Sequence, residues 1–123
     1  MANELTVSTL TVAFTKANVG SVTVTPTALS ITVTGNQFMD NVQTIGVTEE
    51  AILLGDVAPG GYWFVQNQDA TNFVELRAAT GATDFIKLLA GEWAIFRTSA
   101  DATAPFAIAD TGSCNVRFLR FDV

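Results

Sequence analysis

The sequence contains no histidine, a single cysteine and few charged residues, and each of these shortages removes a class of function. Histidine is the usual acid-base group near neutral pH. Its absence excludes a serine or cysteine nucleophile paired with a histidine base, and it excludes histidine-rich metal sites. The one cysteine, Cys114, has no partner for a disulfide within the chain, and we assign it no role.

A pair of carboxylates is the catalytic arrangement that this composition leaves open. Glycosidases use two carboxyl groups about 5 to 10 Å apart, and Asp69 with Glu75, or Glu49 with Glu50, would be such pairs. Acidic residues beside turns are more often solvated surface groups. We therefore predict that the protein is not an enzyme and that it uses no cofactor.

Charge is scarce, because charged residues make up only 15% of the 123 residues whereas hydrophobic residues make up 49%. An average soluble protein has about 25% charged residues. Since each exposed apolar Å² forgoes roughly 25 cal/mol of transfer free energy, a chain with a mean hydropathy of +0.36 is expected to cover part of its surface with other copies or another protein. We expect a homo-oligomer, a trimer or a dimer.

Basic residues are scarcer than acidic ones, six against 12, which gives a formal net charge of −6. The basic residues are scattered singly, at Lys16, Arg77, Lys87, Arg97, Arg117 and Arg120. Nucleic acid, which requires clustered basic residues, is therefore not an expected partner. The sequence contains no run of about 18 apolar residues, the length that would predict a membrane-spanning helix. The first residues lack the features of a secretory signal, so we expect synthesis in the cytoplasm of the host cell.

Residues 5–33 alternate between apolar residues and threonine or serine, which is the periodicity of β-strands. The phase slips between Val7 and Leu10, which suggests a bulge or a crossing between sheets, and Pro26 marks a break or an edge. We predict an N-terminal arm or strand over 1–16 and a β-sandwich domain over 17–123. We expect the apolar positions of the arm, Leu5, Val7, Leu10, Val12 and Phe14, to form an interface with other copies or with a partner protein.

Turn residues recur roughly every 8 to 12 residues after residue 55, which is typical of an all-β chain. The short segments between the turns are rich in aromatic and β-branched residues and predict antiparallel strands at 62–65, 73–76, 85–89, 93–97, 106–109 and 116–123, in a sandwich or a barrel. Residues 62–65 are apolar at every position and are expected to be covered on both faces. Residues 47–52 are the one credible helical turn.

The polar segment between two of these strands holds Asn67, Asp69, Thr71 and Asn72. Calcium favours such oxygen ligands, but the spacing matches no calcium loop. Asparagine and aspartate also form turns by hydrogen bonding to their own backbone. We predict a structural turn at these four residues and no metal site.

Exposed aromatic rings can serve as platforms for sugars, which brings Tyr62, Trp63 and Trp93 into question. Aromatic residues in strands more often belong to the core, and Trp63 stands among apolar neighbours. A carbohydrate-binding β-sandwich module therefore stays as an alternative.

Three segments of the sequence resemble the second half of small structural proteins encoded in the virion gene clusters of tailed bacteriophages. These are FVQNQDATNFVELR, FIKLLAGEWAIFR and PFAIADTGSCNVRFLRFDV. The shared elements are an aromatic strand, an N-x-D-x-T-N turn at 67–72, the Gly91-Glu92 turn before another aromatic strand, and a closing strand from Val116. The resemblance covers roughly residues 52–123.

This resemblance implies an all-β, single-domain antiparallel β-sandwich, jelly-roll-like in form, in a virion structural protein. We expect a capsid decoration (cement) protein that binds the major capsid protein on the capsid exterior and stabilises the head as an oligomer. A tail or fibre-associated component is the alternative within the virion.

Overall fold

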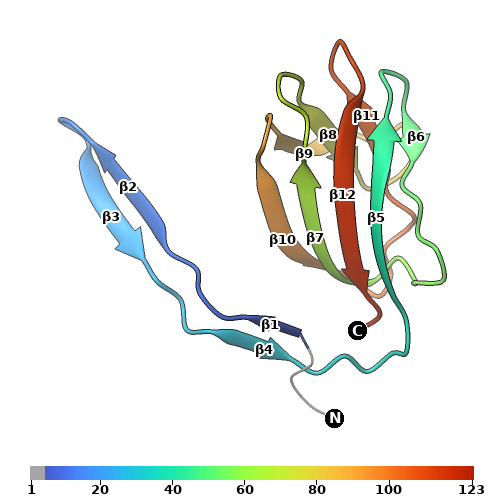
Figure 1. Ribbon diagram of the computed structural model, residues 1–123, viewed down its shortest axis with the longest axis horizontal. Coiled ribbons are helices and arrows are strands. Elements are labelled where there is room, and N and C mark those ends of the chain that lie inside the picture. The colour runs from blue at the N-terminus through green and yellow to red at the C-terminus, as the bar shows by residue number, and fades with distance from the viewer. Residues whose placement is uncertain (1–4) are drawn as a thin grey trace. The chain divides into compact units, whose positions relative to one another are not determined.

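The computed structural model describes residues 5–123, and all of its regular elements there are β-strands. This confirms the all-β prediction. No helix that could cross a membrane occurs in the described part of the chain. The chain divides into two compact units, one ending at Thr34 and the other comprising Gly35–Val123 (Figure 1). We call residues 5–34 the ribbon and residues 35–123 the sandwich.

The ribbon consists of four short strands that pair antiparallel in twos. β1 (Leu5–Val7) pairs with β4 (Leu29–Ile31), and β2 (Val12–Lys16) pairs with β3 (Gly20–Val24). The turn between β2 and β3 places Asn18 at a φ of 62°, a left-handed conformation that asparagine tolerates better than most residues. The Val19 amide closes this turn on the Lys16 carbonyl at 3.1 Å.

Residues 8–11 and 25–28 form no strand and lie between the two paired segments of the ribbon. The predicted slip in phase and Pro26 both fall here. The structure divides the chain after Thr34, whereas the sequence predicts a boundary after Lys16. The difference arises because β2 and β3 are the two arms of one hairpin, so residues on both sides of the predicted boundary belong to the same unit.

The sandwich consists of two four-stranded antiparallel sheets (Figure 1). Sheet I has the order β10-β7-β12-β5 and sheet II the order β6-β11-β8-β9. The bounds are β5 (Phe38–Ile45), β6 (Glu50–Ala51), β7 (Gly61–Asn67), β8 (Val74–Arg77), β9 (Asp84–Leu88), β10 (Trp93–Thr98), β11 (Phe106–Ala109) and β12 (Cys114–Phe121). The strands predicted from 62 onward match β7 to β12 to within two residues at every end.

The core lies between the two sheets and is built by strict alternation. Along β7 and β12 every second residue is buried, including Trp63, Val65 and Phe118, while the intervening residues point away from the core. Alternation arises because successive side chains of a strand point to opposite faces. Trp63 is the largest buried side chain, stacked on Phe96 and edge-on to Phe118.

Two sequence expectations are refined by these elements. Residues 47–52, considered as a helical turn, instead form a bend that leads into β6. On β7 the inner residues Trp63 and Val65 are buried as predicted, whereas Tyr62 and Phe64 on the other face are only half-buried within the described chain.

A buried arginine fastens the β6–β7 loop, and nothing in the sequence analysis predicted it. Arg120 is fully buried, with its guanidinium carbon 4.0 Å from the centroid of the Trp63 ring. Burial lowers its pKa to about 10. The guanidinium donates to backbone carbonyl oxygens of the loop, at Leu54, Val57, Ala58 and Pro59.

Candidate functional site: the outer face of sheet I

The face of sheet I that points away from the core is largely apolar. Cross-strand partners in an antiparallel sheet share a face, so the register places the outward residues of all four strands next to one another. We call this surface the apolar face, and define it by Phe38 and Val42 of β5, Tyr62 and Phe64 of β7, Trp93 and Ile95 of β10, and Leu119 and Phe121 of β12.

The side chains of the apolar face contact one another but are not covered by the sandwich. Phe38 stacks on Phe121 with ring centroids 6.5 Å apart, and Phe64 lies 5.9 Å from Trp93. Phe38 is 68% exposed, Val42 50% and Trp93 47%. A contiguous apolar patch of this kind is typical of a protein–protein interaction surface rather than of a free surface.

The few charges on this face are largely paired. Arg117 makes a two-pronged contact with Asp40, at 2.9 and 2.7 Å, and this hydrogen bonding holds the pKa of Asp40 below its usual range. Arg97 lies over the Tyr62 ring, 5.0 Å from its centroid. The face therefore presents apolar area with one neutralised ion pair.

Sheet II has a different outer surface. Glu75 of β8 faces Lys87 of β9, and Arg77 bridges Asp84 and Glu49. Charged and paired groups of this kind are readily solvated, and Phe85 is the one exposed large apolar side chain in the strands of sheet II, against three in the strands of sheet I. The contrast between the two sheets identifies sheet I as the candidate binding surface.

The predicted turn residues form a network of hydrogen bonds within the protein. Asn67 is fully buried, and its side-chain amide donates to the carbonyl oxygens of Asn72, Leu88 and Leu89, while its Oδ1 accepts the amide of Asp69.

The carboxylate of Asp69 accepts the amides of Thr71 at 2.9 Å and Asn72 at 2.6 Å, which lowers its pKa. Asn72 in turn accepts a hydrogen bond from Thr111 in the β11–β12 turn. The network joins three turns at one end of the sandwich, and Asn67 Oδ1, Asp69 Oδ2 and Asn72 Oδ1 each accept from a protein donor.

The carboxylates considered for catalysis are likewise engaged in structural contacts. Glu49 accepts hydrogen bonds from Arg77, Thr80 and the Gly81 amide, which keep its pKa below the usual range, with Arg77 the largest cause. Glu50 accepts from Gln43 and from the Gly46 amide. The structure therefore shows these two residues, which are adjacent in the sequence, bonded to different parts of the sandwich.

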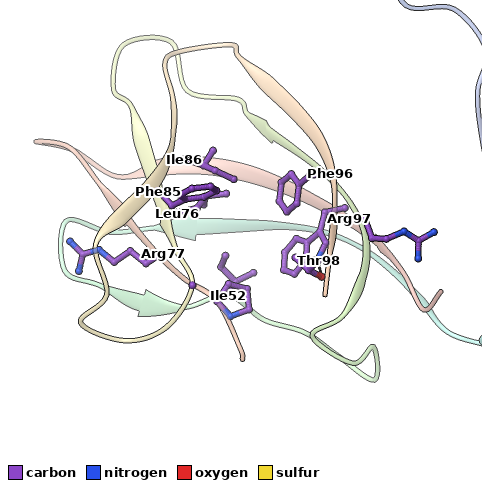
Figure 2. A pocket seen from close by; sticks show the side chains of 11 residues that line it. Ile52, Leu76, Arg77, Phe85, Ile86, Phe96, Arg97 and Thr98 are labelled. Atoms are coloured by element: carbon purple, nitrogen blue, oxygen red, sulfur yellow. Dashed lines mark hydrogen bonds between the residues drawn. The ribbon is translucent and has the colours of Figure 1, made fainter. Parts of the chain in front are cut away.

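A cavity of about 290 Å³ lies between the two sheets (Figure 2). Its lining is mostly apolar and includes Ile52, Leu76, Ile86 and Phe96, which point into the cavity, whereas the Arg77 side chain points away from it. Phe85, at the β9 bulge, also lines it and is 85% exposed. No polar group converges on the cavity in a way that would orient a substrate.

The predicted interface residues of the arm all belong to the ribbon, but they differ in exposure. Val12 and Phe14 of β2 are exposed, whereas Leu5 and Val7 of β1 and Leu10 in the unpaired segment are half-buried. The structure thus places the more accessible part of the predicted interface on the β2–β3 hairpin.

The three aromatic residues considered as a sugar platform are separated. Trp63 is in the core, with its indole Nε1 donating to Thr98, so it is unavailable to a ligand on the surface. Tyr62 and Trp93 do lie on the apolar face. Of the three rings, Tyr62 and Trp93 are therefore the ones that could contribute to a sugar-binding surface.

Two of the eight residues of the apolar face, Phe38 and Val42, escaped the sequence analysis, because no strand was predicted over residues 38–45. In β5 the apolar Phe38 and Val42 point outward, and Gln43 points to the other side, where its amide binds Glu50 and Ala51. A polar residue facing inward breaks the usual alternation. The signal that was present is the apolar pair spaced by an even number of residues, which places both on one face.

Comparisons with family models, with curated proteins and with solved structures gave no match. Within residues 5–123 no three acidic or cysteine side chains gather in a way that would hold a metal ion. The apolar face is therefore the strongest candidate site that the described chain offers.

Proposed function

We propose that this protein is a structural component of a bacteriophage virion, a capsid decoration (cement) protein that binds the outer surface of the head and stabilises it as a homo-oligomer. The apolar face of sheet I is the observation that carries the proposal. The resemblance of residues 52–123 to virion structural proteins supports it, and the major capsid protein is the proposed partner.

The apolar face suits repeated binding at modest affinity. If a large apolar side chain has about 150–200 Å² of area, the exposed fractions of Phe38, Val42 and Trp93 alone leave about 300 Å² to be covered, to which the five half-buried residues of the face add. A specific interface uses about 800 Å² from each partner. One copy would therefore bind weakly, and an oligomer that engages several capsid subunits at once would gain the missing affinity through avidity.

We also propose that the sandwich is a jelly roll, a fold that viral capsid proteins use. The pairing order supports this proposal, because β5 pairs with β12, β6 with β11, β7 with β10 and β8 with β9. These pairs describe one long hairpin. Its rolling into two sheets adds the pairings of β7 with β12 and of β8 with β11.

Binding to phage heads tests the proposed function directly. We expect the purified chain to co-sediment with heads of the phage that encodes it, and Phe38→Ser and Trp93→Ser each to weaken that binding at least about tenfold, a loss of about 1.4 kcal/mol. Both residues are exposed, so the fold should persist. Phe85→Ser is the matched control, because Phe85 is equally apolar and more exposed but lies on sheet II.

Unchanged binding in both variants of sheet I, or an equal loss in Phe85→Ser, would overturn the assignment of the apolar face. Co-sedimentation with tails instead of heads would move the protein to the tail or fibre. The position of the coding sequence beside a major capsid protein gene or among tail genes is an independent test of the same choice.

Carbohydrate binding is the second candidate, favoured by the exposed Trp93 ring next to Gln66, its cross-strand neighbour. A ring beside an amide is the arrangement in which a sugar can stack and also hydrogen bond. Binding on a glycan array that Trp93→Ala abolishes would establish this function, and its absence would exclude it.

A further inference from the structure

We infer that the β2–β3 hairpin of the ribbon is the seam of a homotrimer, in which the apolar side of each hairpin packs against the same side of two other copies. This inference rests on the proposed function only in that a decoration protein acts as an oligomer. It assigns self-association to the ribbon and leaves the apolar face of the sandwich to the capsid.

The register of the hairpin separates its two sides by chemistry. Val12 pairs with Val24 and Phe14 with Val22, and cross-strand pairs lie on one side. The other side carries Ala13 with Thr23, and Thr15 with Ser21. The hairpin therefore has one apolar side and one side that is polar or small.

The apolar side of the hairpin is uncovered. Val12 is 55% exposed, Phe14 46%, Val22 56% and Val24 51%, and every other residue of both strands is exposed as well. A two-stranded hairpin is at best marginally stable in water unless its apolar side packs on something. The hairpin thus needs a partner in order to be ordered.

Charge favours an identical hairpin as that partner. Lys16 is the one charged residue among residues 5–34, and it lies beside the turn. The ribbon therefore offers almost nothing to a partner that recognises charge. Two or three copies of it can pack together with little like-charge repulsion, even though the whole chain carries a net charge of −6.

The area of the apolar side is small, and the arrangement around one axis favours three copies over two. With about 150–200 Å² per side chain, the exposed fractions of the four residues give about 350 Å² per hairpin. Two hairpins would bury about 700 Å² in total, and three would bury about 1,050 Å² or about 350 Å² for each pair, so neither arrangement reaches the roughly 1,000 Å² of a specific pairwise interface by area alone. Three hairpins around one axis also let each apolar side face two neighbours.

Disulfide trapping in the full-length chain tests the seam. In a trimer only residues close to the threefold axis meet the same residue of the other copies, and the apolar side of the hairpin is the side placed there. Val22→Cys should therefore form covalent dimers on mild oxidation. About a third of the chains should stay unlinked, because two of the three introduced cysteines in a trimer pair and the third has no partner. Thr23→Cys, the adjacent residue on the polar side, is the matched control and should stay unlinked, as should the wild type with its buried Cys114.

Light scattering provides the second measurement. The wild type should have three times the 13.0 kDa mass of the chain, Val22→Asp should be a monomer, and Thr23→Asp should remain a trimer. The near-ultraviolet circular dichroism, to which the core residue Trp63 contributes, should be the same in the wild type and both variants, because the substitutions lie in the ribbon and not in the core of the sandwich.

A wild-type monomer or dimer, a trimeric Val22→Asp variant, or equal cross-linking at positions 22 and 23 would overturn the inference. These outcomes are separable from failure of the proposed function. A trimer that does not bind heads refutes the function and leaves the seam, whereas a monomer that saturates heads refutes the seam and the oligomeric part of the function and leaves only the binding to heads.

Discussion

Asn67→Ala should destabilise the sandwich strongly, because the Asn67 side chain links the β7–β8 and β9–β10 turns from a fully buried position. Its amide nitrogen lies 2.9 Å from the Asn72 oxygen, 3.1 Å from that of Leu88 and 3.3 Å from that of Leu89. Its Oδ1 lies 3.0 Å from the Asp69 amide. The alanine side chain has no polar atom, so Asn67→Ala removes all four hydrogen bonds and replaces none of them.

The magnitude follows from the number and the burial of these bonds. A net contribution of about 0.5–1.5 kcal/mol for each intramolecular hydrogen bond, discounted for the long contact to Leu89, predicts a loss of about 2–4 kcal/mol in the free energy of unfolding. For a domain of this size, about 4–8 °C per kcal/mol gives a fall in Tm of at least about 10 °C.

Urea unfolding followed by tryptophan fluorescence, together with thermal unfolding, would measure the loss. Gln68→Ala is the control, since Gln68 is exposed in the same turn and its side chain is not in the network. A loss below about 0.5 kcal/mol for Asn67→Ala would refute the reasoning, since surface substitutions fall in that range. A rise in the wild-type Tm on adding calcium would show that the turn also binds a metal.

Three further results are expected. Phe118→Ala removes a fully buried ring that contacts Trp63 edge-on and should lower the free energy of unfolding by about 3–5 kcal/mol in urea titrations. Hydrogen bonds lower the pKa of Asp69 from its ordinary 3.8 and that of Glu49 from its ordinary 4.5. The stability that these two carboxylates contribute is therefore present above those values and lost as the pH falls below them. Chemical unfolding between pH 6 and pH 2, measured in steps of about one pH unit, would detect this loss, and a free energy of unfolding that does not change with pH would contradict it. Burial raises the pKa of the Cys114 thiol, so a thiol reagent should label the folded protein far more slowly than the urea-unfolded protein, and equal rates would contradict its place in the core.

The sequence predicted the fold class and most of the strands in the sandwich, because aromatic and β-branched residues alternate there between turns rich in glycine, asparagine and aspartate. The polar segment 67–72 is an example, since aspartate accepting the amides two and three residues ahead is a local interaction. Local interactions of this kind can be inferred from neighbouring letters.

The strand β5 shows where that inference failed. Its inward side carries Met39, Asn41 and Gln43, and the polar groups are tolerable there only because the chain places hydrogen-bonding partners beside them, as Glu50 lies beside Gln43. A partner supplied by another strand is not visible in the local pattern. The same holds for Arg120, whose buried charge depends on loop carbonyls some sixty residues earlier in the chain.

The sequence by itself determined that the chain is built of strands, that it lacks the histidines most enzymes use, and that it is rich in apolar residues and poor in charged ones. These properties depend on composition and on spacing along the chain. Only the tertiary structure decided where the surplus apolar side chains go, to one outer face of the sandwich and one side of the hairpin. Which face of a strand is covered depends on the sheet that packs against it, and that sheet is assembled from residues distant in the sequence.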